Sequence, residues 1–282
     1  MKKFILFYLF VNYNKCGDTM KEIMIITGAS SGMGREFSMQ IEKKYQVDEI
    51  WVIARRKERL ESLKEKLQTK VKIFALDLTQ KESFEIIQEA LFQEKPRVKV
   101  LVNCSGYGKI DHYENMSSET IENMMNLNML AVVKMVNTVL PYMHKESHIV
   151  NLASCSGYMP IPYLNIYAAS KAFVLNYSRA LNEELKYRGI HVLSICPYWV
   201  ETEFLDRAVE KDKKPVVIRY GKVYQAKDVI KKAIKDMESS KDVSLYGTIN
   251  RIQILGMKVL PHRLVKKIWM VYQELDGTKG IR

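Results

Sequence analysis

The sequence predicts an α/β domain in which a doubly wound, seven-stranded parallel sheet carries helices on both faces. Short apolar runs alternate with amphipathic stretches along most of the chain, which is typical of parallel strands joined by helical crossovers. The apolar runs are nearly continuous, as expected for strands buried on both faces. The chain has 282 residues, no Gly/Ser/Pro-rich linker and no internal repeat. We therefore expect a single such domain.

Two sequence patterns predict the individual strands and helices. Strands are expected at short apolar runs, namely Ile23–Thr27, Glu49–Ala54, Lys72–Leu76, Val98–Asn103, His148–Ala153, Val192–Cys196 and, more briefly, Ser244–Tyr246. Helices are expected where apolar residues recur at helical spacing, namely Arg35–Lys44, Lys57–Gln68, Ser83–Phe92, Ser118–Met143, Ile166–Arg188 and Ala226–Ser239. Ser118 suits a helix start and Gly189 a helix stop.

The composition narrows the class of protein. Hydrophobic residues make up 47% of the chain and charged residues 27%, as in globular domains. Four cysteines without a Cys-x-x-Cys pair or a cysteine–histidine cluster predict neither a disulfide framework nor a metal site. We therefore expect a cytoplasmic protein. The net charge is +12, and from Leu205 onward 18 Lys and Arg face 9 Asp and Glu. No nucleic-acid-binding motif accompanies this charge.

Both ends of the chain are expected to lie outside the main domain, which we assign to residues 20–250. In residues 1–19, Lys2 and Lys3 precede the apolar run Phe4–Val11, which is too short to span a bilayer and lacks a signal-peptide cleavage site. An over-extended translation start and a membrane-associated tail both remain open. Residues 251–282 form a basic, amphipathic segment that Pro261 should break. A lid role is favoured there over a dimer contact or an interfacial helix pair.

A glycine-rich turn directly after the first expected strand is the most informative stretch of the chain. It reads Thr-Gly-Ala-Ser-Ser-Gly-Met-Gly over residues 27–34. Glycine permits a tight turn and a close approach of phosphate to the backbone. The helix that begins near Gly34 directs free N–H groups at the anion. The turn therefore predicts a pyrophosphate site at the carboxyl edge of the sheet.

Further motifs occur in a fixed order downstream, and together they resemble the classical short-chain dehydrogenase/reductase family. The family's glycine turn is matched by Thr27, Gly28, Gly32 and Gly34, and its Asn-x-x-Gly segment by Asn103 and Gly106. Its four catalytic residues are matched by Asn128, Ser154, Tyr167 and Lys171. The resemblance extends from about Ile23 to Gly247. It implies a Rossmann-type cofactor-binding and catalytic domain, a small carbonyl or alcohol substrate, and a homodimer or homotetramer.

The end of the second strand favours NADP(H) as the cofactor. Enzymes that prefer NAD place a carboxylate here, whereas this chain has Arg55 and Arg56, which suit a 2′-phosphate. By resemblance, Asp77 and Leu78 contact adenine, and Pro197, Val200 and Thr202 close over nicotinamide. The expected cofactor-binding set is Thr27, Gly28, Ser30, Ser31, Gly32, Met33, Gly34, Arg55, Arg56, Asp77, Leu78, Asn103, Gly106, Tyr167, Lys171, Pro197, Val200 and Thr202.

The catalytic residues predict proton transfer coupled to hydride transfer. Tyr167 and Lys171 are four residues apart and share one helix face. A lysine ammonium and an oxidised nicotinamide should lower the pKa of the tyrosine, so that it exchanges protons near neutral pH. The resemblance implies that Ser154 holds the substrate oxygen, and that Asn128 anchors a water that relays protons to Lys171.

The substrate is less closely defined by the sequence. The family's usual glycine after Pro197 is replaced by Tyr198, and this tyrosine, Trp199, Tyr158 and Tyr163 could wall an aromatic pocket. The expected substrate-binding residues are Ser154, Tyr158, Tyr167 and Tyr198. A steroid or bile acid is the favoured substrate, as in hydroxysteroid dehydrogenases, and a 3-oxoacyl thioester is the alternative. A hypothesis from another functional class is that the protein is a non-catalytic NADP(H)-binding regulator. Contact with a membrane surface also stays open.

Overall fold

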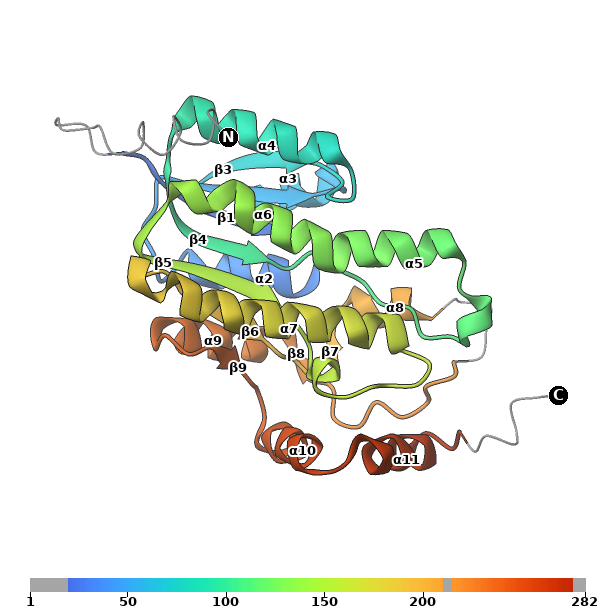
Figure 1. The fold of residues 1–282 in the computed structure, drawn as a ribbon. Helices are drawn as coiled ribbons and strands as arrows, with labels where there is room; N and C mark the ends of the chain where they lie inside the picture. The colour runs from blue at the N-terminus through green and yellow to red at the C-terminus, as the bar shows by residue number, and fades with distance from the viewer. Residues whose placement is uncertain (1–19, 210–214, 276–282) are drawn as a thin grey trace, which may run out of the picture.

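The computed structural model describes residues 20–209 and 215–275 and confirms the doubly wound α/β fold (Figure 1). Seven parallel strands form one sheet in the order β3-β2-β1-β4-β5-β6-β9. Their bounds are β1 Glu22–Thr27, β2 Glu49–Ala54, β3 Lys70–Ala75, β4 Arg97–Asn103, β5 Met143–Leu152, β6 His191–Ile195 and β9 Val243–Ser244. A separate two-stranded pairing joins β7 Val200–Glu201 to β8 Tyr224–Gln225.

Helices cover both faces of the sheet, because strands such as β1 carry apolar side chains on both faces. Its side chains alternate between the faces, so that Met24 and Ile26 join one core and Ile23 and Ile25 the other. The first core is closed by α2 Gly32–Ile41, α3 Lys57–Lys64 and α9 Ala226–Glu238. The second is closed by α4 Lys81–Glu94, α6 Ala131–Val139 and α7 Asn165–Leu185. All four of these β1 side chains are fully buried. Burial of each contributes about 1.5–3 kcal/mol to the stability of the fold.

The helix expected over Ser118–Met143 is interrupted in the structure. It consists of α5 Ser118–Met125, a π-helical segment Asn126–Leu130 and α6, after which a 3-10 turn, Leu140–Tyr142, leads into β5. The turn contains Pro141, which lacks an N–H for helical bonding. Met143 therefore begins a strand instead of ending a helix. Single π-turns are frequent at functional sites.

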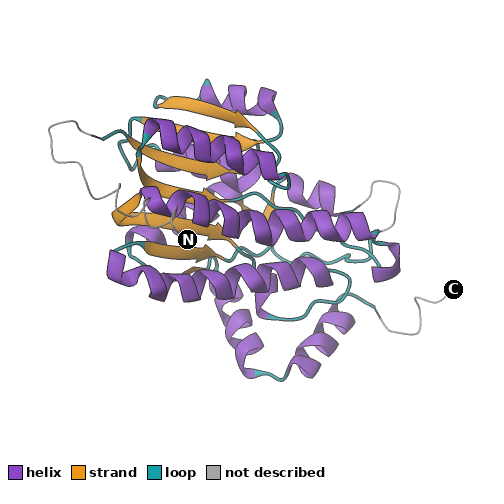
Figure 2. Ribbon diagram, turned by 45° about the horizontal axis from the view of Figure 1, so that its top comes forward, coloured by secondary structure: helices purple, strands orange, loops and turns teal. Residues whose placement is uncertain are grey.

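The remaining elements are short 3-10 turns and three further helices. Short 3-10 turns occur at Tyr113–Asn115, Cys155–Tyr158 and Lys186–Arg188. The later helices are α8 Glu203–Ala208, α10 Thr248–Val259 and α11 His262–Tyr272, and the predicted break at Pro261 is confirmed. Figure 2 shows α10 and α11 as a V-shaped pair outside the helical layers. Among the described residues, no helix is both long and apolar enough to cross a membrane. The expectations for residues 1–19 lie outside the described residues.

Candidate active site

The glycine turn between β1 and α2 is held tightly against the end of β4. Gly28 has a φ of +67°, and a Cβ there would lie 2.7 Å from the Cys104 carbonyl carbon. A Cβ on Gly34 would lie 2.8 Å from the carbonyl carbon of Gly28. Thr27 Oγ1 accepts hydrogen bonds from the N–H groups of Cys104 and Ser105, at 3.1 and 3.2 Å. The turn therefore forms a cradle of backbone groups that side chains would fill.

A cavity of about 170 Å³ lies beside this turn. Arg56 donates to Ser31 Oγ at 2.9 Å and to Ser30 Oγ at 3.2 Å, and Arg55 Nη1 lies 3.6 Å from Asp77 Oδ2. The expected cofactor residues that line this cavity are Gly28, Ser30, Ser31, Gly32, Met33, Gly34, Arg55, Arg56, Asp77, Leu78, Gly106 and Thr202. The structure thus gathers both arginines and the glycine turn around one polar cavity.

Glu203, which was not predicted as a site residue, lies among three arginines. Its carboxylate lies 2.9 Å from Arg56, 2.7 Å from Arg59 and 2.9 Å from Arg207. Partial burial favours a higher pKa for this carboxyl, but the hydrogen bond and charge of Arg56 and the other two arginines lower it overall. The contact with Arg207 is an i,i+4 pair that spacing can indicate, whereas no spacing indicates the contacts with Arg56 and Arg59, which lie far from α8 in the sequence.

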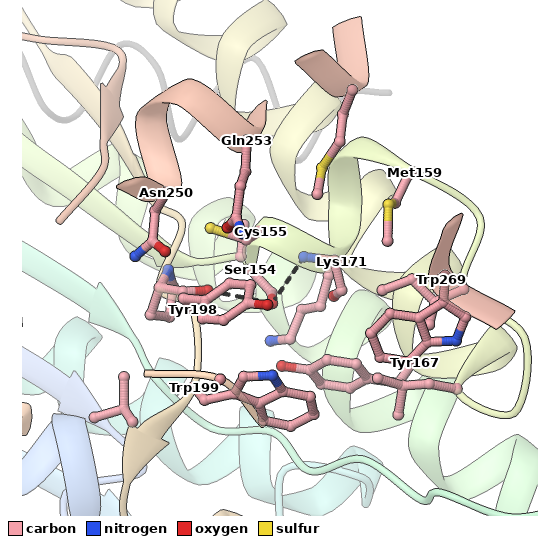
Figure 3. A pocket seen from close by; sticks show the side chains of 18 of the residues that line it. Ser154, Cys155, Met159, Tyr167, Lys171, Tyr198, Trp199, Asn250, Gln253 and Trp269 are labelled. Carbon is pink, nitrogen blue, oxygen red and sulfur yellow. Dashed lines mark hydrogen bonds between the residues drawn. The ribbon is translucent and has the colours of Figure 1, made fainter. Parts of the chain in front are cut away.

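A second, larger cavity of about 480 Å³ is lined by three of the four predicted catalytic residues, Ser154, Tyr167 and Lys171 (Figure 3). Its lining includes Ser154, Tyr167, Lys171, Pro197, Tyr198, Val200 and Thr202. Met33, Gly106 and Thr202 line both cavities, so the two adjoin. An extended dinucleotide whose adenosine end lay in the smaller cavity could thus present its other end to Tyr167.

Local structure aligns the catalytic side chains. Tyr167 lies in the first turn of α7 and Lys171 one turn later, and the Lys171 Nζ is 5.6 Å from the centre of the Tyr167 ring. Lys171 donates to the Leu152 carbonyl at 2.7 Å. Ser154, just beyond β5, is hydrogen-bonded to Tyr167 and accepts from the Ser156 N–H at 3.1 Å. A hydroxyl, a phenol and an ammonium thus meet at one cavity wall.

The pKa of Tyr167 is governed by its burial. Burial raises the pKa of the phenol, and the opposing hydrogen bond to Ser154 is too weak to reverse this. The lowering expected from Lys171 together with an oxidised nicotinamide concerns the cofactor-bound site and stays a prediction. Burial also lowers the pKa of Lys171 to about 8. The protein therefore holds Tyr167 in its protonated form at neutral pH.

Asn128 lies in the π-helical segment, fully buried beside Lys171. A Cβ on Gly106 would lie 2.9 Å from Asn128 Oδ1 and 3.4 Å from Lys171 Nζ. The amide donates to the Tyr107 carbonyl at 2.9 Å and to Ser170 Oγ at 3.0 Å, and accepts from the Tyr107 N–H at 3.1 Å. Its side chain therefore fixes the loop after β4. The expected role as a water anchor stays a prediction.

Some predicted residues lie outside both cavities. Asn103 is buried at the end of β4, where it donates to Asn151 Oδ1 at 2.9 Å and its own Oδ1 has no partner. The expectation that Tyr158 and Tyr163 wall the pocket is corrected. Tyr158 lines neither cavity and packs against a cluster that includes Cys196, and the Tyr163 ring meets His112 edge-on. Thr27 and Asn128 also line neither cavity, although both form hydrogen bonds that hold the loop after β4.

Much of the larger cavity is apolar and comes from the C-terminal helices. Its apolar and sulfur-containing lining includes Met159, Ile161, Leu164, Met257, Leu260, Val265, Ile268 and Trp269. Figure 3 shows Trp269 of α11 and Gln253 of α10 beside the catalytic side chains. The site therefore pairs a polar reaction corner with a long apolar wall.

Comparison with known proteins finds relatives of this chain. A family model described as short chain dehydrogenase matches residues 22–213. The very-long-chain 3-oxoacyl-CoA reductase of Mus musculus is 31% identical over 272 residues, covering 89% of this chain and 84% of that protein. The Rattus norvegicus reductase is 29% identical over 276 residues, with the same coverage. A solved short-chain dehydrogenase from Sphingobium yanoikuyae in complex with NADPH has a TM-score of 0.71 and 26% identity, covering 83% of this chain and 92% of that one.

Proposed function

Because this chain belongs to the short-chain dehydrogenase/reductase family, we propose that it reduces the ketone of a long-chain 3-oxoacyl thioester with NADPH. The observation that carries this proposal is the 480 Å³ cavity, in which Ser154 and Tyr167 stand at one end of a wall of apolar side chains. Such a wall suits a flexible acyl chain. Two mammalian relatives named very-long-chain 3-oxoacyl-CoA reductase support the same class of substrate.

The residues present fit NADP(H). The backbone cradle around Gly28 would hold the pyrophosphate, and Arg55 and Arg56 would hold the 2′-phosphate together with Ser30 and Ser31. The bound cofactor supplies the hydride, which is its own chemistry. The protein contributes the position of the ketone and the proton.

The catalytic side chains would then act on the ketone oxygen. Ser154 would donate a hydrogen bond to this oxygen, and Tyr167 would transfer its proton to it as the alcohol forms. The Tyr167 phenol begins protonated, as reduction requires, because its burial disfavours the phenolate before the reaction. The Lys171 ammonium would stabilise the phenolate that remains. This arrangement argues against a non-catalytic regulator.

The cofactor assignment predicts opposite effects for two variants. Replacing Arg55 and Arg56 by alanine should weaken NADPH binding more than tenfold relative to NADH, since each charge-assisted hydrogen bond is worth roughly 1.5–3 kcal/mol. Glu203→Gln should strengthen NADPH binding and leave NADH unchanged, because the carboxylate shares Arg56 and Arg59. Fluorescence titrations with both cofactors measure these changes.

Arg179→Ala is the matched control for these titrations, because Arg179 pairs with Asp242 away from either cavity. An NADPH/NADH ratio that stays the same in the double arginine variant would refute the 2′-phosphate assignment.

A bulky cyclic ketone such as a steroid is the second candidate substrate. Tyr198 and Trp199 line the cavity, and their rings meet edge-on with centres 6.3 Å apart, which gives a rigid aromatic corner. A panel of 3-oxoacyl-CoA thioesters of increasing chain length, ketosteroids and oxidised bile acids, followed by loss of NADPH absorbance, separates the two. We expect kcat/KM to rise with acyl length and to exceed that of every steroid. The reverse order would favour the steroid.

A further inference from the structure

We propose that the outer surface of α10 and α11 binds an anionic lipid membrane, with the mouth of the substrate cavity facing the lipid. The binding itself goes beyond the reductase activity. Only its consequence for substrate entry rests on the proposed function.

The first observation is a stripe of exposed apolar side chains on each helix. On α10, Ile252, Leu255 and Val259 are 65%, 64% and 74% exposed, at a spacing that places them on one face. On α11, the exposed residues at helical spacing are Leu264, Ile268 and Val271. Single exposed apolar residues need no explanation, but six on two consecutive helices indicate an interaction surface.

The second observation is the charge carried by this pair of helices. From Thr248 to Tyr272 the sequence contains Arg251, Lys258, Arg263, Lys266 and Lys267 but no aspartate or glutamate. All five cations are exposed. Apolar side chains interleaved with lysine and arginine suit insertion at the level of anionic headgroups. The charge complements phospholipid and not a neutral partner.

A second copy of this chain is a poorer occupant. A two-fold interface would place the same five cations of each subunit close to one another, with no acidic residue of α10 or α11 between them. It would also cover the cavity, because Leu260, Ile268 and Tyr272 are exposed and line it as well. A membrane on this surface would instead supply apolar molecules to the cavity.

The consequence for the proposed reaction is a dry route for the substrate. Ile268 and Leu260 connect the outer stripe with the apolar wall that ends at Tyr167. A long acyl chain could therefore pass from the bilayer to the cavity without exposing its methylene groups to water, which is unfavourable for each group.

Vesicle co-sedimentation of the full chain tests the proposal. The probes are vesicles of phosphatidylcholine alone and of phosphatidylcholine with an equal share of phosphatidylserine. We expect binding to the mixed vesicles that weakens with added salt. A triple variant, Lys258→Gln, Lys266→Gln and Lys267→Gln, should bind about 100-fold more weakly. A second variant, Leu255→Asp and Val259→Asp, should lose binding as well.

The matched control is Lys81→Gln, Lys186→Gln and Lys227→Gln, which changes the net charge equally at exposed sites away from α10 and α11. Equal weakening in both triple variants, or none in either, would overturn the proposal. Size-exclusion chromatography of the Leu255→Asp and Val259→Asp variant adds a second outcome. A change from dimer to monomer in this variant, with lipid binding unchanged, would also overturn the proposal. Turnover of a short, soluble 3-oxoacyl thioester should be the same in all variants. Its absence in the wild type would count against the proposed function alone.

Discussion

Tyr167→Phe is expected to lower kcat for ketone reduction by about 10²–10⁴-fold. The substitution removes the proton donor and keeps the ring, which packs against Phe204 with centres 5.1 Å apart. NADPH affinity and the unfolding temperature should therefore change little. Single-turnover kinetics, together with a cofactor titration, measure the effect.

Tyr187→Phe is the control for this substitution, because Tyr187 is 83% exposed in the 3-10 turn after α7 and lines neither cavity. If Tyr167→Phe keeps the turnover of the wild type, the proton comes from another group and the proposed mechanism is wrong.

Gly34→Ala is expected to remove most cofactor binding. The new Cβ would lie 2.8 Å from the carbonyl carbon of Gly28 and 3.1 Å from the carbonyl oxygen of Thr27, and these backbone atoms cannot rotate aside. Overpacking of this kind costs about 1–3 kcal/mol or more in stability. The turn must shift, so NADPH affinity should fall at least about tenfold. Thermal unfolding with and without NADPH measures both effects.

Gly256→Ala is the matched control, because a Cβ at this position in α10 meets nothing within 4 Å. It should stabilise the helix by about 0.5–1 kcal/mol. A Gly34→Ala variant that is stabilised by NADPH as strongly as the wild type would show that the turn does not hold the cofactor.

Local sequence patterns predicted the parts of the site that lie close together in the chain. The turn over residues 27–34 follows its strand directly, and Tyr167 and Lys171 are one helical turn apart. Their geometry is set by neighbouring residues, and the structure brings them together as expected. The strand ends that carry Ser154 and Pro197 follow from the parallel sheet in the same way.

Features that depend on contacts distant in the sequence could not be predicted. Glu203 meets Arg59 across 144 positions, and no periodicity in either segment indicates this pair. Tyr158 and Tyr198 both follow strand ends, but only packing decides that Tyr198 lines the cavity and Tyr158 does not. The raised pKa of Tyr167 likewise comes from the burial of its phenol, which spacing along a helix does not determine.

Transfer of deuterium tests the central claim most directly. The purified protein is given a long-chain 3-oxoacyl-CoA and NADPH deuterated at the transferable position of its nicotinamide ring, and the product is analysed by mass spectrometry. We expect a 3-hydroxyacyl thioester with one deuterium on the carbinol carbon, formed by the wild type and hardly at all by Tyr167→Phe. A product without deuterium, or equal labelling by both proteins, would contradict hydride transfer at the Ser154–Tyr167–Lys171 site.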